Sequence, residues 1–194
     1  FNTGNEATVI GAEIEGRVYI IKKRDSLPNL KLSGNLSYLD HKQDLKIERG
    51  SNGEVVQTFR YGGKDEIGLE GASDWITNIA FSLNTGKRYP YEFTVSANYA
   101  SDRIYALGSP RNQSQPDVFF NGEIIERGVV TLDFIFSKEI NEHLSIGVTA
   151  LNLLNQTIKQ YQNNQSSVTG VPSKDTVLTY TTGINSSLTI NYKF

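Results

Sequence analysis

Within the last nine residues of the chain, Ser186 to Phe194, polar and apolar side chains alternate without a break from Ser187 onward. Successive side chains of a β-strand point to opposite faces, so this stretch predicts a strand with one apolar and one polar face. The apolar face would carry Leu188, Ile190, Tyr192 and Phe194, and the polar face Ser187, Thr189, Asn191 and Lys193. Such a strand needs an apolar medium on one side and water on the other.

Six further segments repeat the same two-residue period, which predicts an all-β, antiparallel protein. The seven expected strands run approximately over Val9 to Lys22, Leu30 to Asp40, Asp74 to Asn84, Tyr91 to Tyr99, Val129 to Lys138, His143 to Asn155 and Val177 to Phe194. The period alone fits both a soluble sandwich, in which the apolar faces meet in a core, and a membrane barrel, in which they face lipid.

The connections between these segments favour the barrel, because short and long ones alternate. The short ones are Arg24 to Asn29, Thr85 to Pro90 and Glu139 to Glu142, and the long polar ones are His41 to Ser73, Asp102 to Gly128 and Gln156 to Thr176. Outer-membrane barrels have short periplasmic turns and longer extracellular loops. The last strand then descends from a long loop, so we expect Phe194 at the periplasmic side of a bacterial outer membrane.

Aromatic residues fall at both ends of the expected strands. Tyr38, Trp75 and Tyr99 would mark the outer ends, and Tyr91, Phe136, Tyr192 and Phe194 the inner ends. Two aromatic girdles are typical of the two membrane interfaces of a barrel.

Seven strands is an odd number, whereas single-chain bacterial barrels have an even one. Either one strand has been missed, near Val55 to Tyr61, or the chain is one arc of a larger barrel. The chain of 194 residues has no methionine and begins at Phe1, so we expect part of a longer polypeptide. We therefore interpret residues 1–194 as about seven C-terminal strands of a transmembrane β-barrel.

Composition excludes several other classes of function. A net charge of −2, with both signs interspersed, offers no basic surface for nucleic acid. No apolar run approaches the roughly 18 residues of a membrane-spanning helix. The only two histidines, His41 and His143, would lie at opposite ends of the strands, and the chain has no cysteine. We therefore expect no catalytic site, no metal site and no cofactor.

Several short stretches, in this order, resemble the C-terminal barrel region of TonB-dependent outer-membrane receptors. They are Thr8–Glu15 (TVIGAEIE), Gly71–Asn78 (GASDWITN), Asp102–Gly108 (DRIYALG), Gln115–Val118 (QPDV), Leu151–Asn155 (LNLLN) and the terminal Tyr192–Phe194 (YKF). Within the family the chain is most similar to receptors with an N-terminal carboxypeptidase-regulatory-like domain.

The resemblance implies active uptake across the outer membrane through a barrel of about 22 strands whose lumen is filled by a plug domain. It implies outer-membrane lipid as the surroundings, TonB as a partner acting through the plug, and a surface lipoprotein as a partner of some relatives. The plug and N-terminal domains do not lie in this chain. A small molecule or an oligomer would suit such a receptor as substrate.

Polar residues on the non-apolar face are the candidates for lining the lumen. They are Glu13, Glu15, Arg17, Lys31, Asn35, Asn78, Glu92, Asn98, Asp133, Asn185 and Asn191. Candidate ligand contacts lie in the long loops, since binding residues concentrate on loops held by a rigid scaffold. They are Arg60, Tyr61, Tyr105, Arg111, Asn112, Phe119 and Phe120.

Two alternatives remain open from the sequence. One is a self-contained outer-membrane barrel or adhesin of about eight strands without transport. The other is a soluble β-sandwich binding module.

Overall fold

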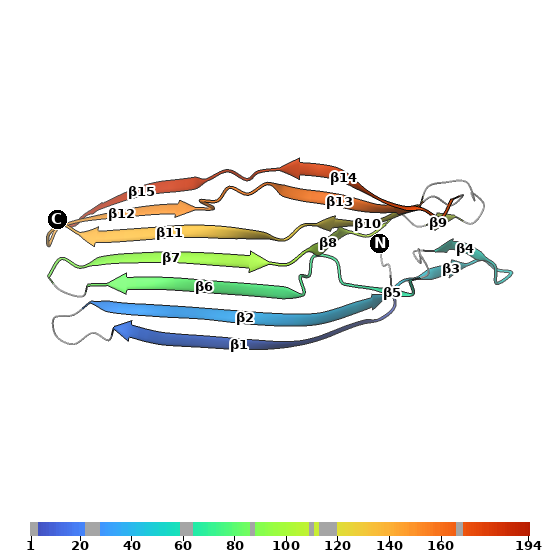
Figure 1. Ribbon diagram of the computed structural model, residues 1–194, viewed down its shortest axis with the longest axis horizontal. Helices are drawn as coiled ribbons and strands as arrows, with labels where there is room; N and C mark the ends of the chain where they lie inside the picture. Colours follow the sequence, from blue (N-terminus) through green and yellow to red (C-terminus); the bar gives the residue numbers. More distant parts are fainter. Residues whose placement is uncertain are drawn as a thin grey trace.

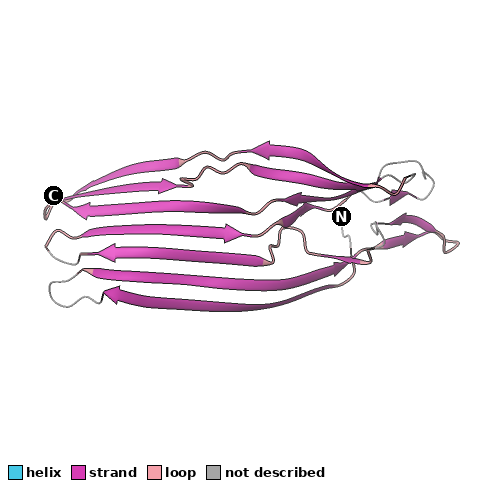
Figure 2. Ribbon diagram, in the orientation of Figure 1, coloured by secondary structure: helices cyan, strands magenta, loops and turns pink. Residues whose placement is uncertain are grey.

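The computed structural model describes residues 4–21, 28–58, 64–85, 88–108, 111–112, 120–165 and 169–194. This part of the chain consists of strands and connecting loops only (Figure 2). All paired strands are antiparallel. The expected all-β, antiparallel fold is therefore confirmed. No helix long and apolar enough to cross a membrane occurs in the described ranges.

Seven long strands form a single main sheet in which each strand pairs with the next long strand of the chain (Figure 1). They are β1 (Ala7–Ile21), β2 (Asn29–Asp44), β6 (Trp75–Asn84), β7 (Tyr91–Ala100), β11 (Val129–Glu139), β12 (Leu144–Leu151) and β15 (Asn185–Tyr192). The short β5 (Glu66–Ile67) pairs with the end of β2. Each expected strand has its counterpart in this sheet.

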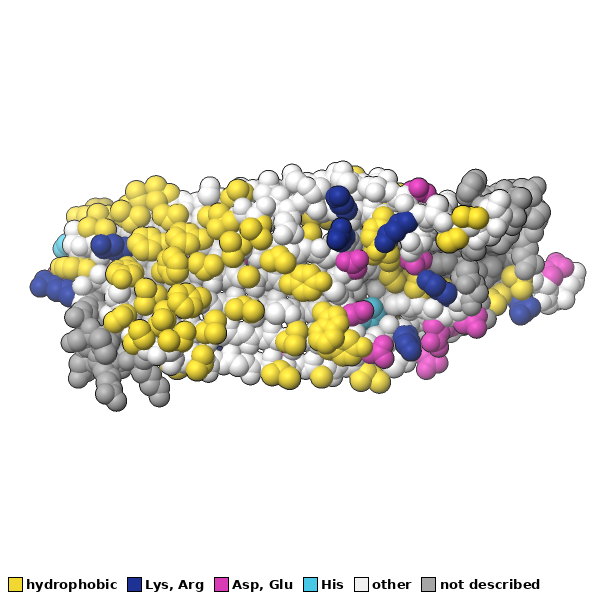
Figure 3. Space-filling model, viewed as in Figure 1, with side chains coloured by type: hydrophobic (Ala, Val, Ile, Leu, Met, Phe, Trp, Pro, Cys, Tyr) yellow, Lys and Arg dark blue, Asp and Glu magenta, His cyan; other side chains and the backbone are white. Residues whose placement is uncertain are grey.

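The register places the apolar side chains of neighbouring strands on the same face. Leu32 faces Phe81, Phe81 faces Val95, and Val148 faces Leu188. Leu32, Phe81 and Leu188 are exposed, Leu188 to 66%, whereas Val95 and Val148 are half-buried. Figure 3 shows hydrophobic side chains spread over this face, while most visible charges gather toward the end that carries β3, β4 and β5.

Few apolar side chains are buried in the described part of the chain. Among the described residues, Leu45 and Ile104 are the only buried hydrophobic side chains. On the central strands β2 and β6, apolar side chains such as Leu36 and Ile79 are more exposed than polar neighbours such as Asn35 and Asn78. Within the described residues the main sheet thus has no hydrophobic core of its own.

A second sheet continues four of the long strands beyond the main sheet (Figure 1). It contains β8 (Arg103–Ala106), β10 (Phe120–Glu126), β13 (Ile158–Gln165) and β14 (Pro172–Tyr180), in the order β14-β13-β10-β8. We call it the end sheet. The expectation of one continuous strand over Val177 to Phe194 is wrong, because this segment divides into the end of β14 and β15.

Left-handed backbone conformations interrupt the strands between the two sheets. Asn152 and Asn155 have φ of 57° and 41°, and Gly183 has φ of 80°. Asparagine and glycine adopt this region at the smallest cost. Side chains replace the interrupted ladder: Asn152 Nδ2 donates to the Gly183 carbonyl oxygen at 2.8 Å, and the Gly183 N–H donates to Asn155 Oδ1 at 3.0 Å.

A small third sheet joins two long loops. It consists of β3 (Ile47–Arg49), β4 (Val55–Thr58) and β9 (Arg111–Asn112), in the order β3-β4-β9. A strand does exist at the start of the segment Val55 to Tyr61, but it pairs outside the main sheet, and residues 59–61 lie outside the described residues. It does not add an eighth long strand to the main sheet.

The two edges of the main sheet run in the same direction. Strands β1 and β15 are the first and last of seven consecutive antiparallel strands, and each pairs with a main-sheet neighbour on one side only. The sheet is open, because β1 and β15 are not paired to each other. An antiparallel pairing between these two edges is impossible, since it requires opposite directions.

Candidate functional site

The polar face of the main sheet brings most of the expected lumen residues together. The register places Glu15 opposite Asn35, Asn35 opposite Asn78, and Asn78 opposite Asn98. Asn98 faces Thr131 on β11. Five strands therefore contribute to one polar row.

Hydrogen bonds connect the first part of this row. Asn35 Nδ2 donates to Glu13 Oε1 at 2.9 Å, and Asn78 Nδ2 donates to Asn35 Oδ1 at 2.8 Å. A carboxylate only accepts hydrogen bonds, so Glu13 fixes the orientation of the Asn35 amide, which in turn fixes that of Asn78. This chain of bonds ends at Asn78 Oδ1.

A second hydrogen-bonded chain starts from Asp133 on β11. Asn98 Nδ2 donates to Asp133 Oδ2 at 3.0 Å and lies 3.3 Å from Thr131 Oγ1. The other carboxylate oxygen, Asp133 Oδ1, accepts the backbone N–H of Asn152 at 2.9 Å. Asp133 therefore ties the polar row to the interrupted segment after β12, and this chain ends at Asn98 Oδ1.

Two hollows lie on the polar face. The central hollow has a volume of about 340 Å³, and Glu15, Arg17, Asn78, Ser96 and Asn98 are among its lining residues. A second hollow of about 280 Å³ includes Lys31 and Glu92, which were also expected to line the lumen. The Asn84 amide donates a hydrogen bond to Glu92 there.

The remaining expected lumen residues, Asn185 and Asn191, lie on the edge strand β15. Asn191 faces Ser145 and donates to its hydroxyl at 3.4 Å, whereas Asn185 faces Leu151. Neither residue lines the hollows described above.

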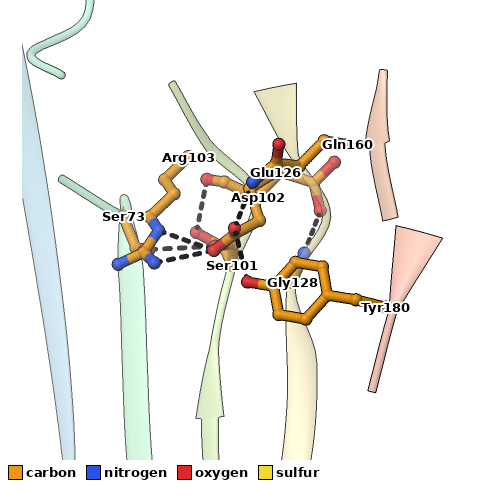
Figure 4. A network of polar contacts seen from close by, with 8 residues as sticks. All are labelled: Ser73, Ser101, Asp102, Arg103, Glu126, Gly128, Gln160 and Tyr180. Carbon is orange, nitrogen blue, oxygen red and sulfur yellow. Dashed lines mark hydrogen bonds and ion pairs between the residues drawn. The ribbon is translucent and has the colours of Figure 1, made fainter. Parts of the chain in front are cut away.

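The end sheet is held by a buried carboxylate, Glu126, at the end of β10 (Figure 4). Its Oε1 accepts two hydrogen bonds from Arg103, at 3.0 and 2.6 Å, and its Oε2 accepts one from Gln160 at 2.8 Å. Tyr180 Oη lies 3.4 Å from Oε2. The Glu126 cluster, formed by these four residues, therefore connects all four strands of the end sheet.

This arrangement shifts two pKa values in opposite directions. Burial alone would raise the pKa of Glu126, but the hydrogen bond from Gln160 and the contact with Arg103 outweigh it, so the pKa is lowered. Burial and the negative charge of Glu126 raise the pKa of Tyr180. Glu126 is therefore an ionised, fully partnered carboxylate at neutral pH.

A cleft of about 610 Å³ lies between the end of β2 and the end sheet, and His41, Asp74, Arg103, Glu123 and Tyr161 are among its lining residues. His41 Nδ1 accepts the backbone N–H of Leu69 at 2.9 Å. The buried Nε2 lies 3.1 Å from Asp74 Oδ1 but has no partner in hydrogen-bond geometry among the described residues. No group of three or more metal-ligating side chains occurs within the described ranges.

The expected ligand contacts are placed only in part. Tyr105 lies on β8 and is 51% exposed, and it does not line the cleft. Arg111 and Asn112 form β9, and Phe120 begins β10. Arg60, Tyr61 and Phe119 lie outside the described residues.

Sequence reasoning missed the Glu126 cluster and the cleft. Glu126 and Gln160 stand in segments with no alternation of apolar and polar residues, and their burial depends on partners far away in the chain. Two stretches singled out as parts of a resemblance, Gly71–Asn78 and Asp102–Gly108, contain residues that line the cleft.

Comparisons of the chain with protein-family models, with curated proteins and with solved structures gave no match.

Proposed function

We propose that the chain is the C-terminal arc of a TonB-dependent outer-membrane receptor, which takes up a substrate actively across the outer membrane. In this proposal the main sheet is part of the barrel wall, with its apolar face toward lipid and its polar face toward the lumen. The end sheet and the cleft project from the extracellular side, and Phe194 lies at the periplasmic side.

The single observation that carries the proposal is the inverted polarity of the main sheet. Its apolar side chains are exposed on one face, and a hydrogen-bonded polar row covers the other. A barrel wall has this pattern, with apolar residues outward and polar residues toward the lumen. A sandwich would bury its apolar faces between two sheets, so the small number of buried apolar side chains argues against it.

The directions of the two edge strands support an arc over a self-contained barrel. Since β1 and β15 run the same way, antiparallel closure needs an odd number of additional strands. A barrel of about 22 strands would supply about fifteen more from the rest of the polypeptide. A rotationally arranged ring of copies of this chain would leave parallel seams, which bacterial barrels avoid.

Cysteine scanning in outer-membrane vesicles tests the membrane part of the proposal. The chain has no cysteine, so single cysteines can be placed at Leu32, Ile79 and Leu188 on the apolar face and at Asn35, Ala80 and Thr189 on the polar face. A bimane label should be quenched by brominated lipid at the first three positions and not at the last three. Equal labelling of all six by a water-soluble reagent, in a protein that purifies without detergent, would favour the soluble sandwich.

Binding of TonB tests the transport part. The complete gene product should bind the purified periplasmic domain of TonB, and removing the region upstream of this chain should abolish that binding. If the complete product has about this size, closes alone and does not bind TonB, the self-contained barrel without transport replaces the proposal.

A further inference from the structure

The central hollow of the polar face presents two hydrogen-bond acceptors side by side. The chain from Glu13 ends at Asn78 Oδ1 and the chain from Asp133 ends at Asn98 Oδ1. Asn78 and Asn98 face each other directly on β6 and β7. Reversing the Asn78 amide would set its oxygen against Asn35 Oδ1, and reversing the Asn98 amide would set its oxygen against the Asp133 carboxylate. Both amide oxygens are therefore held toward the middle of the row.

Neither amide oxygen has a donor within the described residues, although both residues line the hollow. Glu15 stands beside them, opposite Asn35, and its carboxylate also makes no hydrogen bond within that part of the chain. Arg17 is the cationic residue that lines the hollow, but it lies in the next row, opposite Ser33 on β2. The centre of the hollow therefore offers acceptors and a negative charge without a matching donor.

We propose that this hollow binds the guanidinium group of an arginine side chain. A guanidinium carries five N–H donors in a planar fork and no acceptor, so it can bridge two amide oxygens. The adjacent Glu15 carboxylate supplies the charge that strengthens these hydrogen bonds. A neutral urea group of the same shape lacks that charge and binds more weakly.

The source of the arginine rests on the proposed function: it belongs either to the segment that fills the lumen or to a peptide substrate passing through it. The binding chemistry is the same in both cases. If the hollow does not bind arginine, the results of the lipid-quenching and TonB-binding experiments do not change. The proposed site can therefore be refuted without refuting the proposed function.

The test uses the complete protein in detergent, with a fluorine label on Ser96→Cys, which lines the hollow. The probes are argininamide and its neutral isostere citrullinamide. Where no segment of the complete protein already occupies the hollow, argininamide should shift the fluorine resonance saturably, with an affinity about tenfold higher than that of citrullinamide. The same label on Ser145→Cys, which is on the polar face but outside the hollow, should not respond.

Two variants decide whether the amide oxygens are responsible. Replacing both acceptors (Asn78→Leu with Asn98→Leu) should abolish the shift, whereas Asn191→Leu should leave it unchanged. Arg17→Gln leaves the acceptors intact and removes the nearby positive charge, so it should strengthen argininamide binding about twofold to fivefold. Equal shifts with citrullinamide, an unaffected double variant, or weaker binding in Arg17→Gln would each overturn the proposal.

Photo-cross-linking identifies the source of the arginine. Benzoylphenylalanine at Ala80, another residue of the hollow, should capture the occupant in the complete protein. A cross-link to an arginine-containing upstream peptide, with no argininamide shift, identifies the lumen-filling segment. No cross-link together with an argininamide shift identifies an external ligand. No cross-link without a shift, or a cross-link to a peptide lacking arginine, refutes the site.

Discussion

The main sheet exposes large apolar side chains, whereas the end sheet buries polar ones, although several hairpins run through both sheets. In the main sheet, Ile79 and Leu188 are more than half exposed. In the end sheet, Glu126 and Gln160 are 7% and 3% accessible.

The difference indicates that the two sheets are stable in different surroundings. A sheet that leaves its apolar face open is stable only where an apolar medium covers that face. A sheet that buries a carboxylate must supply every hydrogen bond itself, as the Glu126 cluster does. This contrast supports the proposed membrane boundary between the two sheets.

Placing a charge on the apolar face should have the largest effect. Ile79→Arg and Ala80→Arg change neighbouring residues on opposite faces of β6. Under the proposed function, Ile79→Arg should destabilise the protein in lipid vesicles by about 2–4 kcal/mol, because an arginine near the bilayer centre loses its hydration. Ala80→Arg points into the central hollow and should cost far less.

Denaturant titration of refolding in vesicles measures both free energies. If the apolar face were covered by water, Ile79→Arg would lie within about 0.5 kcal/mol of wild type, as exposed substitutions do. That result would remove the contrast between the two sheets.

Breaking the Glu126 cluster should have the next largest effect, and on the end sheet only. Glu126→Ala leaves Gln160 and Arg103 without their acceptor, which we expect to cost about 1–3 kcal/mol. The lower part of that range is expected, because the Arg103 side chain is 45% exposed and water replaces part of its contact. Hydrogen exchange should report faster opening of β10 and β13, with the main sheet unchanged.

The same cluster predicts the direction of a pH effect. Because the pKa of Glu126 is lowered on folding, its contribution is fully present above its ordinary value of about 4.5 and is lost as the pH falls through the lower folded value. Protection of β10, corrected for intrinsic exchange, should fall in that acidic window in wild type and less in Glu126→Gln. The control is Glu142→Gln, which removes a carboxylate from an ion pair with Arg88 in which both side chains are exposed to solvent.

The main sheet could be predicted from the sequence because each strand carries its own two-residue period. The alternation Leu188, Ile190, Tyr192 fixes both the strand and the face it presents, without knowledge of any partner. For the polar face, the sequence predicted which residues are candidates for lining the lumen, but not which of them are neighbours. Which asparagines meet depends on register, and a shift of one residue would move them all to the other face.

The end sheet could not be predicted for a physical reason. Glu126 and Gln160 are polar residues that become buried only because Arg103 and Tyr180 reach them from other strands. Local pattern carries no information about such partners. The interruption at Gly183 was missed because apolar residues occur on both sides of it, at Val177 and at Leu188.

Removing the asparagine that joins the two sheets should have an intermediate effect. Asn152→Ala loses the side-chain bonds to Thr182 and Gly183 and places alanine at a φ of 57°, for a total cost of about 1–2 kcal/mol. Asn152→Gly loses the same bonds without the backbone strain. Unfolding free energies in vesicles should therefore rank wild type, then glycine, then alanine. Equal values for the two variants would show that strain contributes nothing there.

The smallest effect should come from the aromatic pair at the boundary between the two sheets. Tyr38 and Trp75 face each other across β2 and β6, with ring centroids 4.6 Å apart and planes tilted by 43°. Aromatic pairs of this kind contribute about 0.5–1.5 kcal/mol beyond the area they bury. A double-mutant cycle of Tyr38→Leu and Trp75→Leu should give a coupling free energy in that range.

Because interfacial aromatic side chains also anchor a barrel individually, each single variant should cost more in vesicles than the coupling alone. If the single variants cost nothing and only the coupling remained, the pair would be an ordinary cross-strand contact, and the boundary between the two regions would not lie at Tyr38 and Trp75.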